Sequence, residues 1–417
     1  MTTRNTMINC TAVATLAAAV FLALPGCQGH GKYVQEGVDR AQENMARVKA
    51  MTEYDMAKQQ YMAGDLDKAI RTVDNSAALA PDVPKVHVLR GRILFEMDRL
   101  EDAVDAFDRC LALEEDNDEA LYFKGIVHER FTQYGDALEY YAAAAASNAT
   151  EAQYTLAQAE MLVQLGRLDE AEDVLTQGTR AFEHNAGIRQ TLGHIALMQG
   201  DVAQAAQLFG EACLLAPADP ALIEDLARAQ IGAREFLEAE YSLRRLLRME
   251  ETGERRDLRL LQARCLAELD RPVEARSILL ELVADERGAN DVDAWIELGN
   301  VALLLEDDFR LRQAASRLMA ITPHEADGYL FMAMFERRSG KPEQALQTLE
   351  SAKGLSDGGS EVALLRAVLY QEMGREDEAR RALALALRRN PTDENTGRLM
   401  EEMGLGAPVA SVPIDDE

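Results

Sequence analysis

The stretch that decides the fold reads DAWIELGNVALLLEDD over residues 293–308 and is completed by LMAITP over residues 318–323. Its apolar residues recur at spacings of three and four, which is the period of a helix with one buried face. Trp295, Leu298 and Ala302 follow this period, Gly299 lies among them, and Pro323 closes the second apolar run. The stretch therefore predicts two short helices in succession.

The same arrangement recurs along the chain. Steps of 34 residues, with two-residue insertions before the seventh and eighth units, give ten units over residues 50–393. Position 20 of the unit is alanine in nine units, and Leu311 takes that place in the eighth. The units begin at residues 50, 84, 118, 152, 186, 220, 256, 292, 326 and 360, and the alanines are Ala69, Ala103, Ala137, Ala171, Ala205, Ala239, Ala275, Ala345 and Ala379.

In these residues the chain resembles the tetratricopeptide-repeat (TPR) family, since Trp295, Leu298, Gly299, Ala302 and Pro323 stand at the family's positions 4, 7, 8, 11 and 32. The resemblance implies an all-α fold, a right-handed TPR α-solenoid built from helix-turn-helix pairs. Ala- and Leu-rich composition with only 11 prolines agrees with helices throughout.

Three positions depart from the repeat pattern and predict local distortion. Gln158 replaces a usual leucine, Pro272 falls at position 17, and Leu311 would crowd the contact between the helices of its unit. The insertions at 254–255 and 290–291 coincide with two of these sites. We therefore expect a change of superhelical pitch between the sixth and eighth units, near residues 254–291.

The glycines and prolines of the units mark helix ends. Glycine recurs at position 15, where the chain leaves the first helix and a left-handed conformation favours glycine. Proline follows the second helix in four units. The residues are Gly64, Gly166, Gly200, Gly340 and Gly374, and Pro81, Pro217, Pro323 and Pro391.

The N-terminus has the features of an export signal. An apolar run from Thr11 to Leu24 predicts a signal peptide over residues 1–26, and Leu24–Cys27 resembles the lipobox of bacterial lipoproteins. That resemblance implies a lipid on Cys27 and an envelope protein that faces the periplasm, anchored in the outer membrane. The alternative is an ordinary signal peptide followed by a chance cysteine, which gives a secreted or soluble periplasmic protein.

Two further segments flank the repeats. Residues 27–49 are expected to form the anchor linker and a leading helix, because Val34, Val38, Ala41, Met45 and Val48 make one apolar stripe. Residues 394–417 are expected to form a capping helix and then a disordered acidic tail.

Charge and motif content exclude several functions. The formal charge of −28 repels nucleic acid. The six histidines lack metal-ligand spacing, no catalytic or nucleotide-binding motif fits, and the repeats leave no room for a catalytic domain. Cys110, Cys213 and Cys265 lie too far apart in a solenoid to pair, so we expect buried free thiols. We expect no enzyme, metal, cofactor or small-molecule substrate.

By the resemblance, the first helices of TPR units line a concave groove through positions 2, 5, 6, 9, 12 and 13. In the first three units these positions predict an aromatic groove with three cations, suited to a peptide with apolar anchors and an acidic group. The alternative for each aromatic residue is packing against the next repeat. The predicted groove residues are Tyr54, Lys58, Tyr61, Lys85, Arg92, Phe95, Tyr122, Phe123 and Ile126.

The sequence thus predicts a scaffold or adaptor that binds a protein or peptide partner. Two alternatives remain open: a structural subunit of a secretion, pilus or polysaccharide-export assembly, and an accessory that localises an enzyme.

Overall fold

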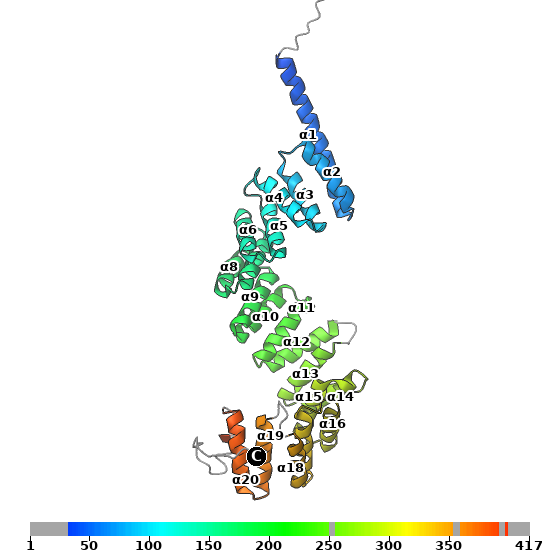
Figure 1. The fold of residues 1–417 in the computed structure, drawn as a ribbon, viewed down its shortest axis with the longest axis vertical. Helices are drawn as coiled ribbons and strands as arrows, with labels where there is room; N and C mark the ends of the chain where they lie inside the picture. The colour runs from blue at the N-terminus through cyan, green and yellow to red at the C-terminus, as the bar shows by residue number, and fades with distance from the viewer. Residues whose placement is uncertain (1–31, 250–254, 353–358, 392–396, 399–417) are drawn as a thin grey trace, which may run out of the picture. The chain divides into compact units, whose positions relative to one another are not determined.

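A computed structural model describes residues 32–249, 255–352, 359–391 and 397–398. These residues form twenty α-helices and one short 3-10 helix, with no strand among them (Figure 1). The predicted all-α class is confirmed. The helices are α1 Lys32–Met62, α2 Leu66–Leu79, α3 Pro84–Glu96, α4 Leu100–Leu111, α5 Asp118–Arg130, α6 Tyr134–Ser147, α7 Ala152–Gln164, α8 Leu168–Ala181, α9 Ala186–Gln199, α10 Val202–Leu215, α11 Pro220–Gly232, α12 Phe236–Met249, α13 Arg256–Glu268, α14 Pro272–Leu282, η1 Gly288–Asn290, α15 Val292–Leu304, α16 Asp308–Ile321, α17 Asp327–Arg338, α18 Pro342–Ser351, α19 Gly359–Glu372 and α20 Glu376–Arg389.

The predicted repeat register agrees with the observed helices. The first helices of the second to eighth repeats, α3 to α15, begin at the expected residues, and those of the last two begin within one residue of them. In the first repeat, the leading segment and the first helix are one continuous helix, α1. In every repeat except the fourth, which the boundary between two compact units divides, the two helices contact each other, as expected for stacked pairs.

Position 15 adopts a left-handed backbone in all ten repeats. Five repeats have the expected glycine there, with φ between 71° and 87°. The other five repeats have a residue other than glycine in the same backbone conformation, which is sterically unfavourable for a residue with a side chain. They are Asp98, Thr132, Arg234, Asp270 and Glu306.

In the second, third and fifth repeats, the close approach of the two helices depends on glycine at position 8. A Cβ added to Gly91, Gly125 or Gly193 would overlap the aromatic ring at position 24 of the same repeat. Those rings belong to Phe107, Tyr141 and Phe209, and all three are buried. The ring thus fills the space that the missing side chain leaves, and the pair sets how closely the two helices approach.

In the eighth repeat, the side chains at positions 20 and 24 have the opposite relative sizes from those in the other repeats. Leu311 occupies position 20 and is buried, while Ala315, also buried, takes position 24, where the other repeats have a larger residue. The ring beside Gly299 comes instead from Phe331 of the next repeat. Leu311 is therefore accommodated by the small neighbour one turn later.

The expectation of a distortion at Pro272 is wrong. Pro272 is the first residue of α14, where its missing N–H has no helical partner to lose. Gln158 and Leu311 lie within the unbroken helices α7 and α16. The expected change of pitch near residues 254–291 stays a prediction.

The chain divides into two compact units, Met1–Arg167 and Leu168–Glu417. In the first unit the buried core surrounds residues such as Phe107 and Tyr141, and in the second it surrounds residues such as Leu243, Trp295 and Leu349. The boundary falls between the two helices of the fourth repeat.

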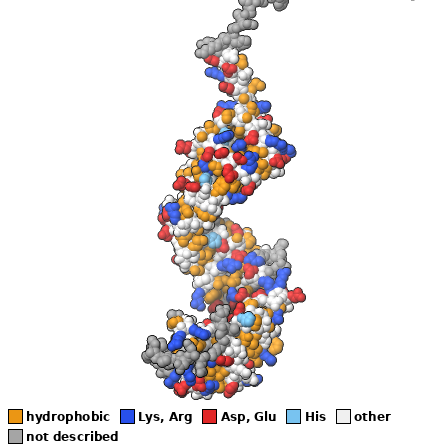
Figure 2. Space-filling model, in the orientation of Figure 1, with side chains coloured by type: hydrophobic (Ala, Val, Ile, Leu, Met, Phe, Trp, Pro, Cys, Tyr) orange, Lys and Arg blue, Asp and Glu red, His pale blue; other side chains and the backbone are white. Residues whose placement is uncertain are grey.

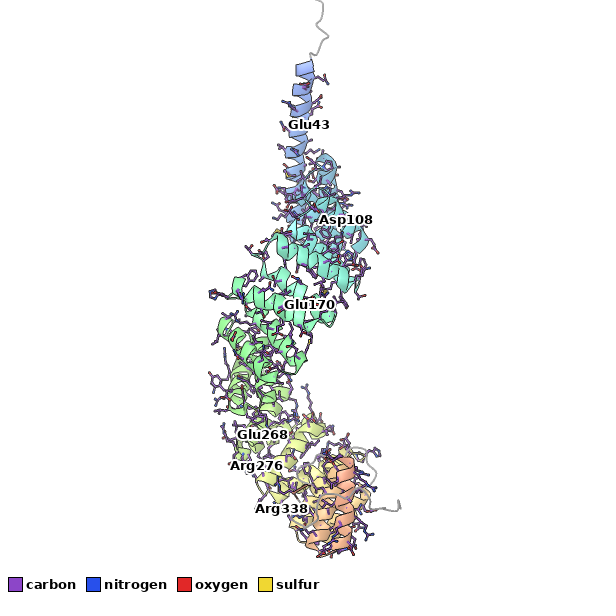
Figure 3. The ribbon with its side chains drawn as sticks, turned by 90° about the vertical axis from the view of Figure 1, so that its left-hand side faces the viewer. Glu43, Asp108, Glu170, Glu268, Arg276 and Arg338 are labelled. Atoms are coloured by element: carbon purple, nitrogen blue, oxygen red, sulfur yellow. The ribbon has the colours of Figure 1, made fainter. Side chains whose placement is uncertain are left out.

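The N-terminal part of α1 runs beyond its packed part. Figure 3 shows Glu43 on this extension, above the end of α2. Val38, Met45 and Val48 of the expected apolar stripe are 42%, 74% and 69% exposed. The leading segment therefore extends the first repeat without burying its stripe. The expected signal peptide, Cys27 and most of the capping segment and tail lie outside the described residues.

Candidate functional site: the inner face of the first three repeats

The nine predicted groove residues lie on three first helices, α1, α3 and α5. α1 contacts α3, and α3 contacts α5, so these helices form one continuous layer in the first unit. Lys58 and Lys85 are exposed, and the other seven residues are half-buried. None of the nine is fully buried, so each leaves part of its side chain exposed, and we refer to the surface that these nine residues form on α1, α3 and α5 as the inner face.

Arg92 connects all three repeats. Its guanidinium lies over the rings of Tyr61, at 5.4 Å, and Phe123, at 4.9 Å, measured to the ring centroids. Its Nη1 also donates a hydrogen bond of 2.6 Å to Oε1 of Glu119. Burial disfavours the charge, but the Glu119 carboxylate and the Tyr61 side chain together outweigh it and raise the pKa of Arg92. Arg92 therefore stays charged and is largely committed to contacts within the protein.

Lys58 and Lys85, the other two cations of this surface, are more accessible to a ligand than Arg92. Lys85 Nζ lies 4.8 Å from the ring centroid of Tyr54. Burial, together with the Glu119 and Asp55 carboxylates, raises the pKa of the Tyr54 hydroxyl, which keeps it a neutral donor. Lys58 is exposed and makes no recorded ion pair within the described ranges. Lys58 and Lys85 are thus the cations that a ligand could reach.

The aromatic residues of α5 also serve the packing of the repeats. The Tyr122 ring lies 5.6 Å from Phe123 and 5.0 Å from Tyr154, which belongs to the next repeat, and its hydroxyl accepts a hydrogen bond from Gln153. Burial raises the pKa of this hydroxyl. Phe123 stacks on Phe107 at 6.1 Å.

Ile126 and Phe95 have similar surroundings. Ile126 packs beside the buried Tyr141, and Arg130 lies 5.8 Å from the Phe95 ring centroid. The aromatic part of the inner face therefore holds neighbouring repeats together as well as lining the surface.

Sequence reasoning missed the acidic residues of this face. Asp55, Glu96, Glu119 and Glu129 occupy the same groove positions of the first three repeats as the predicted residues. Glu119 pairs with Arg92, and Glu129 accepts a hydrogen bond of 2.7 Å from the Tyr141 hydroxyl. Examining every groove position for opposite charges would have revealed them. The inner face is mixed in charge, as is the visible surface in Figure 2, where red and blue side chains are interspersed.

Other chemical features of the described part are few. Cys110, Cys213 and Cys265 are buried free thiols, as expected. Burial, reinforced by nearby carboxylates, raises the pKa of Cys110 to about 12 and that of Cys265 to about 11, so neither is a thiolate at neutral pH. Within the described ranges, no cluster of three His, Cys, Asp or Glu residues could hold a metal ion. No helix there is long and apolar enough to cross a membrane.

Comparisons with known proteins agree on the repeat. Two family models, both described as tetratricopeptide repeat, match the chain; the first covers residues 54–120, 89–152, 124–186, 156–221 and 224–291, and the second covers residues 336–402. No curated protein sequence matches the chain.

Several solved structures are similar to parts of the chain. The C-terminal part of a TPR repeat-containing protein from Cytophaga hutchinsonii is 16% identical, with 58% of this chain and 97% of that chain covered and a TM-score of 0.48. MamA from Desulfovibrio magneticus RS-1 is 21% identical, with 41% and 97% covered and a TM-score of 0.38. Pseudomonas aeruginosa pilF is 19% identical, with 49% and 92% covered and a TM-score of 0.40.

Proposed function

Since the chain belongs to the tetratricopeptide-repeat family, we propose that it is a cell-envelope scaffold that binds a peptide or partner subunit on the inner face of its first three repeats. The observation that carries this proposal is the half-buried aromatic layer of α1, α3 and α5, flanked by the exposed Lys58 and Lys85. Partly buried aromatic residues are the usual anchors of protein interfaces.

The contacts of Arg92 indicate which cations an acidic group of the ligand would pair with. Because Glu119 already neutralises Arg92, an acidic group of the ligand would pair with Lys58 or Lys85 instead. Tyr54 lies beside Lys85 and supplies an apolar contact next to that charge. The preferred ligand is therefore a peptide with an apolar anchor and an acidic residue close to it, bound near α1 and α3.

Site-specific photocrosslinking tests this surface. A crosslinking residue at position 58 is expected to capture a discrete partner, whereas one at position 68, an exposed lysine on α2, is not. With the crosslinking residue kept at position 58, Tyr54→Ala and Lys85→Glu should each reduce the capture, and Lys68→Glu should not. Equal capture from positions 58 and 68 would count against the inner face as the binding surface.

Membrane anchoring is a separate part of the proposal. A lipid on Cys27 would tether the repeats to the outer membrane on its periplasmic side, and two acyl chains suffice for stable attachment. Cys27→Ala should move the protein from the membrane fraction to the soluble fraction and remove the mass of the lipid. A wild-type chain that is already in the soluble fraction and carries no lipid mass would favour the alternative of a secreted or soluble periplasmic protein.

We propose a non-enzymatic role, without a cofactor, small-molecule substrate or nucleic-acid partner, because the repeats occupy the chain from residue 50 to residue 393. The two alternative roles predict different behaviour of the purified chain. A structural subunit of an envelope assembly would form an oligomer without any partner. An accessory that localises an enzyme would co-purify with an activity that is lost on separation.

A further inference from the structure

The N-terminal part of α1 has no packing partner among the described residues. Figure 1 shows it as the blue helix that runs beyond α2. Residues 35–45 are all exposed, and the first buried residue is Ala50, whose carbonyl accepts a hydrogen bond of 2.7 Å from the Ser76 hydroxyl of α2. Isolated helices of about 12–15 residues are marginal in water, and Gly37 and Asn44 are poor helix formers. A further contact is therefore needed to stabilise this part of α1.

The exposed part of α1 carries a row of apolar residues with the spacing of a coiled-coil seam. Val38, Ala41, Met45 and Val48 follow each other at alternating intervals of three and four residues, and all four are exposed. We call this row the α1 stripe. Single apolar residues are common on protein surfaces, but a row at this spacing forms one continuous edge along the helix. In a coiled coil, such an edge packs against the same edge of a second helix.

The α1 stripe faces away from the first repeat. Ala50 and Ala57 are buried on the side of α1 that packs against this repeat. At 3.6 residues per turn, these two alanines lie roughly 150° around the helix from the middle of the stripe. Rearranged side chains of the first repeat therefore cannot cover the stripe, and its partner has to come from elsewhere.

The charges of this segment favour contact with a second copy of the same segment. Residues 32–52 hold four basic and three acidic residues, in a chain of formal charge −28, so two such segments would not repel each other. Between residues 35 and 44, the positions that flank the stripe are uncharged, and the acidic residues lie on the opposite side of the helix. The flanking residues are Gln35, Gly37, Gln42 and Asn44, and the acidic residues are Glu36, Asp39 and Glu43.

A membrane surface fits the stripe less well than a second helix does. Helices that lie on membranes usually combine large apolar residues, such as Trp, Phe or Leu, with a basic opposite face. The α1 stripe contains none of those three residue types, and the opposite side of the helix carries Glu36, Asp39 and Glu43. A narrow row of Val, Ala and Met fits a contact between two helices.

We propose that the α1 stripe packs against the α1 stripe of a second copy of this chain, in a short two-helix coiled coil. Each copy uses its stripe once, so the pairing closes as a twofold dimer. Tyr54 and Lys58 of the inner face lie roughly 120–160° around α1 from the stripe, so both inner faces stay accessible in the dimer. The seam is shorter than three heptads, so we expect the dimer to dissociate at micromolar concentrations.

Sedimentation equilibrium tests the dimer with two variants that change the net charge equally. All chains carry Cys27→Ala, so that association through a lipid plays no part. Met45→Lys/Val48→Lys places two charges in the seam and should weaken association by at least tenfold, with the repeats still folded because both residues are exposed. Asp39→Asn/Glu43→Gln removes two negative charges from the opposite side and should leave the dimer intact.

Hydrogen exchange of the same chains shows whether the pairing stabilises α1. Residues 35–45 should exchange faster in Met45→Lys/Val48→Lys than in Asp39→Asn/Glu43→Gln, and α3–α20 should exchange equally in both. A chain that stays monomeric at about 300 µM would overturn the proposal. A dimer that Met45→Lys/Val48→Lys does not weaken would also overturn it, because the contact would then lie on another surface.

A bifunctional thiol-reactive crosslinker locates the contact. Met45→Cys, near the middle of the stripe, should join two copies through residue 45, as identified by mass spectrometry of the linked peptides. Glu43→Cys, exposed on the opposite side, should not. Cys110, Cys213 and Cys265 are buried and should not react. Equal crosslinking from positions 43 and 45, or a product in whole cells that links position 45 to a different protein, would contradict the pairing of two copies.

Discussion

Thr132 is the most strained of the five side chains in left-handed turns, because it is β-branched and has a φ of 59°. Thr132→Gly should raise the free energy of unfolding by about 0.5–1 kcal/mol, since relief of strain exceeds the added freedom of glycine in the unfolded chain. The urea midpoint measures this gain. Gly166→Thr, at the same turn position with φ of 73°, provides the reverse change and should destabilise the protein. A lower midpoint for Thr132→Gly would contradict the strain argument.

Asp225 gives a pH-dependent contribution with a defined sign. Burial alone would raise the pKa of this carboxyl, but hydrogen bonds from His194 and Gln190 outweigh it and lower the pKa. A lowered folded-state pKa stabilises the fold above the unfolded pKa of about 3.9, and this stabilisation is lost as the pH falls through the folded value.

Asp225→Asn should therefore reduce stability by about 1 kcal/mol at pH 7 and by less at a pH below the unfolded value of about 3.9. Urea unfolding at both pH values measures the difference. Asp293→Asn, at an exposed site on α15 without a recorded ion pair, is the control and should show no such change. An equal loss at both pH values would contradict the assignment.

The packing of α15 against α16 in the eighth repeat depends on a large side chain at position 20 and a small one at position 24, the reverse of the other repeats. Leu311→Ala alone should leave a cavity and cost about 2–5 kcal/mol, and Ala315→Leu alone should overpack the contact. The double variant restores the arrangement of the other repeats, so it should recover part of both losses. Thermal unfolding of the three variants measures this coupling. Additive losses would mean that the two positions do not compensate each other.

The positions of the helices could be predicted from the sequence because the packing of two helices within one repeat imposes a requirement on the sequence. A small residue such as Gly91 or Ala103 is needed wherever two helices of one repeat approach, and this need recurs at a fixed spacing. Pro272 was misjudged because the sequence alone leaves a helix boundary uncertain by about two residues, and the second helix begins at position 17, where a proline opens the helix instead of interrupting it.

The candidate site was less predictable because its charges pair between repeats. Arg92 and Glu119 are 27 residues apart and meet only when α3 and α5 stack. The position of η1 depends likewise on its carbonyls, which accept hydrogen bonds from Trp295 and Arg317 on two different helices. Repeat spacing predicts neither contact, since both depend on which side chains fill positions that the fold leaves variable.

Each of the two units is held together, among the described residues, by contacts between helices that are near neighbours in sequence, so the two units should respond separately to damage. The recorded helix contacts join helices one or two apart in order, and this locality confines the effect of a core mutation to nearby repeats. Phe107→Ala should cost about 3–5 kcal/mol, because the ring fills the space beside Gly91. Hydrogen exchange should then accelerate in α2–α5 and remain unchanged in α12–α16. Leu349→Ala, in the core of the second unit, should leave α2–α5 protected. Faster exchange throughout both units in either variant would instead mean that the solenoid unfolds as one cooperative body.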